Sequence, residues 1–205
     1  MTVRILAASD LHENTPQVKK LAKAAQRQKA DVIVLAGDLT YFDHDWKGMV
    51  GPFLEKRKMV VFVAGNHDSP ATAELLSQKY GIKNLETYAT IIDDVGFFGC
   101  GGGGANIGIN FPTEQEIAEA LEAGFRYVKD AKRKVMVTHV HPKGGKVEKL
   151  FGFRGSEAVT KAIRKFKPDI HIFGHVHEAE GTIETIGTTE SICVGEHGKI
   201  IELSP

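Results

Sequence analysis

The apolar residues of the chain gather in short runs that predict β-strands. Each run holds four to six residues and is rich in valine, isoleucine, leucine or alanine. Near-continuous apolar runs of this length are typical of strands that are covered on both faces. The predicted strands span residues 3–8, 32–35, 59–64, 135–138 and 170–173.

Helical periodicity appears in three segments between these strands. The first follows Thr15 and Pro16, which suit a helix cap and a first helical residue. The second opens with Thr113 and Glu116 at capping-box spacing, and the third starts near Ser156. Apolar residues recur at helical spacing at Val18, Leu21, Ala22 and Ala25, at Ile117, Ala120, Leu121 and Val128, and at Val159, Ala162, Ile163 and Phe166. This alternation of strand and helix favours a layered α/β fold.

Two stretches depart from the alternation. Residues 87–99 are predicted to form two strands joined by a tight turn at Asp93 and Asp94, and residues 181–203 to form three short strands. They indicate either a mixed sheet or a second sheet packed on the first. Because the chain has 205 residues and no low-complexity linker, we expect residues 1–205 to form a single domain.

Composition narrows the class of protein. Hydrophobic residues make up 42% and charged residues 25%, and no apolar run is long enough to cross a bilayer, so we expect a soluble protein. Lys plus Arg number 26, as do Asp plus Glu, so no stable nucleic-acid or membrane partner is expected. The strand at 3–8 leaves no room for a secretory signal after Met1, which predicts a cytoplasmic location. Cys100 and Cys193 form no CxxC pair, so neither a disulfide framework nor a thiolate zinc site is supported.

Polar residues follow the carboxyl ends of all five predicted strands. In open α/β sheets the ligand crevice lies beyond these ends, so residues distant in sequence are expected to meet there. The segments are SDLHEN (9–14), AGDLT (36–40), AGNHDSP (64–70), THVHP (138–142) and FGHVHE (173–178).

This set of side chains favours transition-metal binding. Asp10 with His12, and His175 with His177, are pairs two residues apart, and extended backbone places such side chains on one face about 6.6 Å apart. Mixed carboxylate, amide and imidazole ligands suit Mn, Fe, Zn, Ni or Co better than Mg or Ca. Six or seven candidate ligands exceed the four of a tetrahedral zinc site, so we expect two divalent ions.

The ordered blocks Asp-x-His, Gly-Asp, Gly-Asn-His-Asp, His and Gly-His-x-His run from Ser9 to His177 and resemble the calcineurin-like metallophosphoesterase superfamily. The resemblance implies a four-layer αββα sandwich with two mixed β-sheets flanked by helices. It implies one metal held by Asp10, His12, Asp38 and His177, and a second held by Asp38, Asn66, His139 and His175. It also implies that His67 is the catalytic histidine and binds no metal. Gly65 is expected to give room for a sharp turn.

The implied activity is metal-dependent hydrolysis of a small phosphoester. A hydroxide bridging the two metals would attack phosphorus, and His67 would stabilise the transition state or protonate the leaving alkoxide. Two divalent ions, two carboxylates and one hydroxide leave about one positive charge, which favours a monoanionic phosphodiester or nucleotide-like substrate over a dianionic monoester. Asn66 and His67 are expected to contact the substrate, with Asn14 and Tyr41 as further candidates. A nuclease and a non-enzymatic scaffold or binding module on the same fold remain alternatives.

Some positions depart from the family pattern. Tyr41 stands where the phosphoprotein phosphatase branch has an aspartate that supports the catalytic histidine, so protein phosphatase activity is not expected. His141 competes with His139 as a ligand, and we favour His139 because it directly follows the strand. Asp68 is expected to cap a turn or orient a neighbour.

The sequence allows two interpretations of some other segments. Residues 100–106 (CGGGGAN) are expected to form a flexible or tightly packed turn rather than a phosphate cradle, because no P-loop lysine follows them. Residues 142–155 carry several basic residues and form either a substrate-facing loop or an ordinary connection. Histidines without a supporting pattern are taken as structural; these are His44, His171 and His197.

Overall fold

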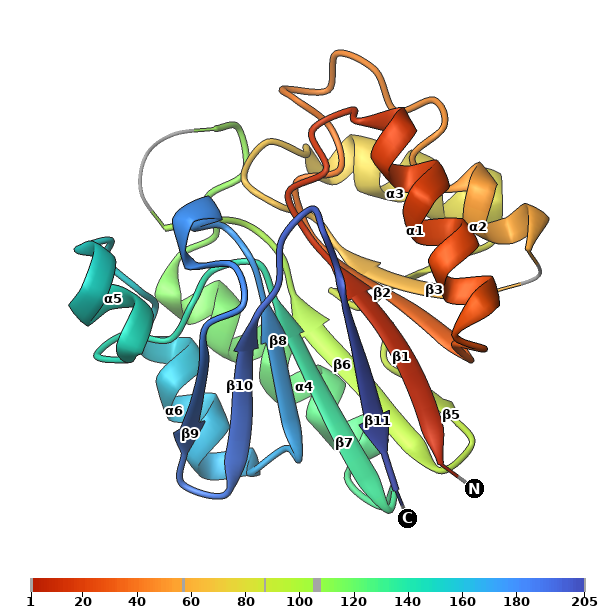
Figure 1. Cartoon of the computed structure of the whole chain (residues 1–205). Coiled ribbons are helices and arrows are strands. Elements are labelled where there is room, and N and C mark those ends of the chain that lie inside the picture. The colour runs from red at the N-terminus through yellow and green to blue at the C-terminus, as the bar shows by residue number, and fades with distance from the viewer. Residues whose placement is uncertain (1, 57, 87, 105–107, 205) are drawn as a thin grey trace.

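Two β-sheets pack face to face in the computed structural model, which describes residues 2–56, 58–86, 88–104 and 108–204 (Figure 1). The first sheet has the order β11 (Lys199–Leu203), β1 (Val3–Ala8), β2 (Val32–Ala36), β3 (Met59–Val63) and β4 (Lys83–Asn84). The second has the order β5 (Thr90–Ile92), β6 (Val95–Cys100), β7 (Arg133–Thr138), β8 (Ile170–Phe173), β10 (Thr189–Cys193) and β9 (Ile183–Ile186). Each sheet combines parallel and antiparallel pairs.

Successive strand residues alternate between the two faces of their sheet and so fill two different cores. Ile5 and Val34 of the first sheet belong to one buried cluster with Phe97 and Ile172 of the second, between the sheets. Their neighbours along the strands, such as Ile33, point outward into a second cluster with the helices. The central strands therefore have no solvated face, which explains their near-continuous apolar runs.

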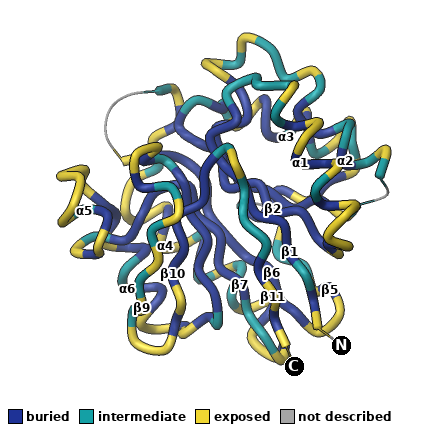
Figure 2. The backbone as a smooth tube through the Cα atoms, in the orientation of Figure 1, coloured by how far each residue is buried: buried dark blue, intermediate teal, exposed yellow. Residues whose placement is uncertain are grey.

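Helices cover the outer face of each sheet (Figure 1). The helices α1 (Thr15–Arg27), α2 (Gly51–Glu55) and α3 (Pro70–Tyr80) share a buried cluster with the first sheet. The helices α4 (Glu114–Val128) and α6 (Glu157–Phe166) share one with the second. The predicted αββα sandwich is confirmed, and Figure 2 shows its buried strands between more exposed helices.

The predicted elements form, with small differences at their ends. All five apolar strands and all three periodic helices are present, including the capping box at Thr113 and the cap at Ser156. The cap of α1 is Asn14 rather than Thr15, because the Asn14 side chain accepts a hydrogen bond from the Gln17 backbone N–H. Five elements were not predicted: α2, α3, β4, α5 (Lys146–Phe151) and the 3-10 helix η1 (His177–Ala179).

The two unusual stretches also form the predicted strands. Asp93 and Asp94 have φ values of 47° and 66°, as a tight hairpin turn between β5 and β6 requires, while Thr87 lies outside the described residues. β9 and β10 join the second sheet, but β11 crosses to the first and pairs antiparallel with β1. This crossing brings Gly195 over the end of β1, where its carbonyl accepts from the Ser9 N–H.

Among the described residues, we find no helix with the length and apolarity needed to cross a membrane.

Candidate metal centre

The side chains that follow β1, β2, β3, β7 and β8 converge around the carboxylate of Asp38. Its Oδ2 atom lies 3.6 Å from His12 Nε2, 3.4 Å from His139 Nε2 and 3.9 Å from His67 Nε2. Asp38 is 2% exposed, so these contacts lie inside the protein. The carboxylate is therefore central to the cluster, in the position predicted for a shared ligand.

One half of the cluster is formed by Asp10, His12 and His177, whose potential ligand atoms all lie within 4.8 Å of one another. The Nε2 atoms of His12 and His177 are 3.2 Å apart, and His177 Nε2 is 3.4 Å from Asp10 Oδ1. His177 begins the short 3-10 helix η1 (His177–Ala179), and its side chain is 60% exposed. This half therefore opens toward solvent.

The other half is deeper and is organised by Asn66. Asn66 Oδ1 lies 2.9 Å from His139 Nε2 and 2.8 Å from His175 Nδ1. Asp10 links the two halves: its Oδ2 accepts from the His175 backbone N–H at 3.1 Å, and with Asp38 and His139 it forms a second group of ligand atoms within 4.8 Å. All seven predicted ligands therefore meet at one place.

Four of the converging residues have left-handed backbone conformations. The φ angles are 55° at Asp10, 40° at His12, 51° at Asp38 and 75° at His175. Such conformations are costly for residues with a Cβ and are found mainly at functional sites. The loops after β1, β2 and β8 therefore accept strain that turns these side chains toward one another.

Gly65 allows the chain to approach Asp38 closely. A Cβ at this position would lie 1.9 Å from Asp38 Oδ1, so no other residue fits. The chain bends at residues 66–68 directly after Gly65, in line with the predicted sharp turn, although Gly65 is not among the residues with positive φ. What requires glycine is the packing of the β3 end against the shared carboxylate.

Backbone contacts set the orientation of the deepest histidine. His139 Nδ1 lies 2.8 Å from the Ala36 carbonyl, which only accepts hydrogen bonds, so Nδ1 carries the hydrogen and Nε2 faces the cluster. Burial lowers the pKa of His139, but the neighbouring Asp38 carboxylate outweighs it and raises this pKa to about 9. Burial likewise disfavours ionised Asp38, yet His139 and the His67 N–H hold its pKa below the usual range.

The donor set fits divalent cations. Asp10 Oδ1, which lies 3.4 Å from His177 Nε2, is buried without a hydrogen-bond partner, although buried polar atoms are almost always bonded. Two ligands of a tetrahedral ion with bonds of 2.0–2.1 Å lie about 3.3 Å apart. The 3.2 Å between His12 Nε2 and His177 Nε2 matches this spacing. Two imidazole nitrogens facing each other so closely are readily explained by a common cation.

His67 lies beside the cluster. Its backbone N–H donates to Asp38 Oδ1 at 2.8 Å. The Tyr41 ring stacks on the His67 ring with centroids 5.2 Å apart and an interplanar angle of 14°, and Phe42 meets it edge-on at 4.4 Å. Burial lowers the pKa of His67, despite the opposing effect of Asp38. A neutral imidazole is therefore held against the cluster by aromatic packing.

Comparison with known proteins decides the family. The family model described as Calcineurin-like phosphoesterase matches residues 3–179, which hold all of the residues above. The chain belongs to this family. A curated relative, UPF0046 protein K07C11.7 of Caenorhabditis elegans, is 28% identical over 211 residues, covering 91% of this chain and 68% of the relative.

Solved structures share the phosphoesterase fold. The protein TT1561 of Thermus thermophilus superimposes with a TM-score of 0.78 at 19% identity, covering 96% of this chain and 91% of that one. A dimetal phosphatase from Danio rerio gives 0.63 at 13% identity, covering 95% and 88%. At these identities the likeness concerns the fold alone.

Asp68 holds the phosphoesterase site together without facing it. Its carboxylate accepts from the backbone N–H groups of Leu39 at 3.0 Å, Thr40 at 2.7 Å and Gly65 at 2.9 Å. These bonds join the loops that follow β2 and β3. The predicted orienting role is therefore supported, and the cap of α3 is supplied by Ser69 instead.

The remaining histidines have protein partners. His141 Nε2 bonds the Phe153 carbonyl at 2.9 Å, which leaves His139 as the histidine that faces Asp38. The rings of the three histidines predicted to be structural contact other side chains: His44 contacts Glu13, His171 contacts Thr138 and Ser191, and His197 contacts Glu180.

A cavity of about 360 Å³ opens beside the exposed half of the cluster. Asn14 lines it, with its side-chain Nδ2 donating to Glu196 Oε2 at 3.0 Å. Glu180 and His197 also line it, together with the ligands Asp10, His12 and His177. The two glutamates were not predicted as site residues, because neither carries a motif: Glu196 lies on the crossing from β10 to β11, and Glu180 follows η1.

The structure bears on the two segments, 100–106 and 142–155, for which the sequence allowed two interpretations. Residues 101–103 pack tightly: a Cβ on Gly103 would lie 2.7 Å from Asn66 Cβ. Gly104 is exposed, and Ala105 and Asn106 lie outside the described residues. The segment 142–155 contains the helix α5, whose Val147 is buried with Phe173 and Val176. A packed turn is therefore supported for the glycines, and the second segment is partly anchored.

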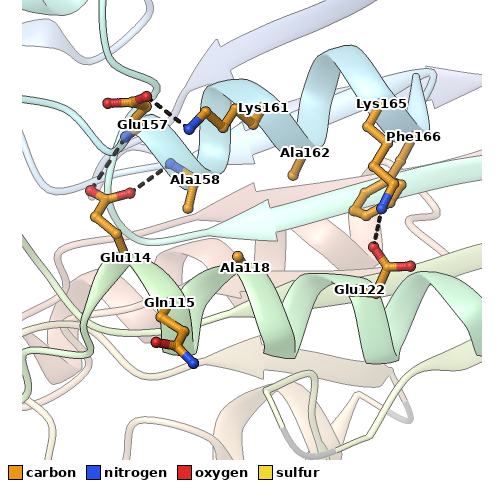
Figure 3. A pocket seen from close by; sticks show the side chains of 10 residues that line it. All are labelled: Glu114, Gln115, Ala118, Glu122, Glu157, Ala158, Lys161, Ala162, Lys165 and Phe166. Atoms are coloured by element: carbon orange, nitrogen blue, oxygen red, sulfur yellow. Dashed lines mark hydrogen bonds and ion pairs between the residues drawn. The ribbon is translucent and has the colours of Figure 1, made fainter.

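A separate hollow of about 450 Å³ lies between α4 and α6 (Figure 3). Its lysines pair with glutamates on its own walls, Lys161 with Glu157 and Lys165 with Glu122. None of its lining residues belongs to the metal cluster. This hollow therefore provides no chemistry for the phosphoesterase site.

Proposed function

We propose that the chain is a dinuclear metal-dependent phosphoric ester hydrolase that acts on a small phosphoester, with phosphodiesters favoured. The observation that carries the proposal is the convergence of six other candidate metal ligands around Asp38, with His67 beside them. Mixed carboxylate, amide and imidazole donors suit Mn, Fe, Ni, Zn or Co.

Each side chain has a defined task in this proposal. Paired divalent ions, when bound, supply a nucleophile at neutral pH and neutralise phosphoryl charge. Asp38 would contact both ions; Asp10, His12 and His177 would complete one site, and Asn66, His139 and His175 the other. His67 would direct Nε2, which faces Asp38, at the phosphoryl or leaving oxygen and give it a hydrogen bond or a proton. Asn66 and His67 would thus also meet the substrate.

The charge around the cavity supports a diester. Glu180 and Glu196 line it, and its described lining residues include no lysine or arginine. A phosphomonoester carries a second negative charge at neutral pH and would find no lysine or arginine among these lining residues. A diester carries one negative charge and has a second ester group for the cavity to hold. Asn14 and Tyr41 are proposed as further contacts to these groups.

Hydrolysis of bis(p-nitrophenyl) phosphate and p-nitrophenyl phosphate tests the proposal. Mn, Ni, Zn or Mg is added to chelator-treated protein, and we expect the diester to be cleaved faster in one of the first three. His67→Ala should lower kcat by about 10²–10⁴. Tyr127→Ala is the control, because Tyr127 is 68% exposed on α4, far from Asp38 in sequence.

The other outcomes separate the alternatives. Inactivity with every metal, despite two bound ions, would favour a scaffold. Cleavage of the monoester alone would overturn the diester preference. Faster degradation of single-stranded DNA than of either small ester would favour a nuclease.

A further inference from the structure

We propose that Tyr41 and Phe42 form an aromatic platform that binds a flat ring on one ester group of the substrate, such as an aryl group or a nucleobase. This inference rests on the proposed function and specifies its substrate class. Both rings belong to the loop that follows Asp38, so the platform and the reacting centre share one segment of chain.

The platform joins directly onto the catalytic candidate. Tyr41 stacks on His67, and Phe42 lies edge-on to both rings, 4.9 Å from Tyr41 and 4.4 Å from His67 between centroids. The His12 ring meets Tyr41 at 5.8 Å. The His12 and His67 rings touch each other with centroids 5.1 Å apart, so a phosphoryl group held beside this pair would have an aromatic wall next to one of its substituents.

The two rings are exposed where they lie against the centre. Tyr41 is 55% exposed and Phe42 42%. Two adjacent large apolar side chains left in water at the edge of a reacting centre are a common feature of ligand sites. Stacked and edge-to-face contacts with a flat ring would use this surface.

The loop is held rigidly in this conformation. Glu13, next to the ligand His12, accepts from the N–H groups of Tyr41 at 3.1 Å and Asp45 at 2.7 Å, and contacts His44 Nδ1 at 3.1 Å. Phe42 has a φ of 56°, a strained conformation for a bulky residue. The strain turns the ring outward, so the platform is formed before any ligand arrives.

The kind of substrate that fits can be inferred from the side chains on the two sides of the centre. The cavity beside His177 is lined by Glu180 and Glu196 and suits a group that donates hydrogen bonds. The Tyr41 side offers ring faces and edges, which favour a flat apolar group. A diester with one aromatic and one hydroxyl-bearing substituent matches both sides.

Non-hydrolysable phosphonates test the platform in the metal-loaded protein. Phenyl-, cyclohexyl- and methylphosphonate are compared as inhibitors of diester hydrolysis and, independently, as ligands in calorimetry. We expect phenylphosphonate to bind most tightly. Tyr41→Ala and Phe42→Ala should each reduce the phenyl-to-methyl affinity ratio by about fivefold or more, whereas Tyr41→Phe should retain it. Using the ratio removes any general change at the metal centre.

Tyr127→Ala is the matched control, since Tyr127 is 68% exposed on α4, far from the platform loop in sequence. A phenyl preference that is absent from the natural chain, or unchanged in both alanine variants, would overturn the platform. Failure of all three phosphonates and of inorganic phosphate to bind would instead contradict the proposed function. The two failures are therefore distinguishable.

Discussion

The buried His171 and the partly exposed pair His12 and His177 at the metal centre differ in how completely the protein satisfies their ring nitrogens. Inside the second sheet, His171 has both ring nitrogens bonded, Nε2 to Thr138 Oγ1 and Nδ1 to Ser191 Oγ, each at 2.8 Å. At the metal centre, the Nε2 atoms of His12 and His177 face each other, and His12 Nδ1 has no hydrogen-bond partner.

The donors and acceptors in the two hydrogen bonds of His171 can be assigned. The Thr138 hydroxyl donates to the Val140 carbonyl, so it accepts from His171 Nε2, and Ser191 donates to Nδ1. Burial lowers the pKa of His171 to about 3, which keeps it neutral. A histidine whose two ring nitrogens both bond hydroxyl groups therefore stabilises the fold, whereas histidines whose ring nitrogens face each other are placed to bind a ligand.

The largest expected effect is at the shared carboxylate. Asp38→Asn should lower diester hydrolysis by a factor on the order of 10³, because it removes charge between the two sites. Metal content measured by mass spectrometry should fall below two ions per chain. Asp93→Asn, the same change in an exposed hairpin turn, is the control. Retention of both ions and of activity by Asp38→Asn would contradict the assignment.

His171→Ala should instead lower the free energy of unfolding and leave metal binding unchanged. It leaves the Thr138 and Ser191 hydroxyls without their ring partner in a fully buried site, at a cost of about 2–4 kcal/mol. Urea unfolding measures this loss. Metal content should stay at two ions, and a decrease would show that His171 and the metal centre are coupled.

Metal binding at the cluster around Asp38 should stabilise the folded chain. At a free metal concentration of 100 times Kd, folding gains about 2.7 kcal/mol per site, or about 5–10 °C in Tm for a chain of this size. Differential scanning fluorimetry with and without Mn measures the shift. His171→Ala should keep it and Asp38→Asn should lose most of it. A shift of the same size in both would place the metal elsewhere.

A smaller effect is expected in the pH dependence of stability. The pKa of His171 is about 3 in the folded chain and 6.5 in the unfolded one, so the unfolded chain takes up the proton first. Stability therefore falls as pH decreases from about 6.5 toward 3, by about 2 kcal/mol between pH 7 and 5 from this group. His171→Gln, which does not titrate, should lose this component in urea unfolding. Equal pH profiles would contradict a neutral, buried His171.

The sequence predicted most of the fold because its main elements carry local signals. Strands such as β2 and β7 are continuous apolar runs, and α1, α4 and α6 combine caps with helical periodicity. The helix α5 has six residues between glycines, too few for a periodic pattern. The crossing of β11 to the first sheet depends on tertiary pairing, which no local pattern specifies.

The site was predictable for a different reason. A single Asp or His after a strand has many explanations, but five ordered blocks have few, and all seven proposed ligands meet in the structure. Residues without a motif were missed. Glu13 and Phe42 matter through loop conformation, and Glu196 through the strand crossing. The adjacent rings of Tyr41 and Phe42 were the one available signal.

Anomalous diffraction from crystals grown with Mn would locate the ions of the dinuclear centre. We expect two peaks about 3.5–4 Å apart. One should lie among Asp10, His12 and His177, the other among Asn66, His139 and His175, and both should contact Asp38. A single peak, or two peaks that do not share Asp38, would contradict the dinuclear centre.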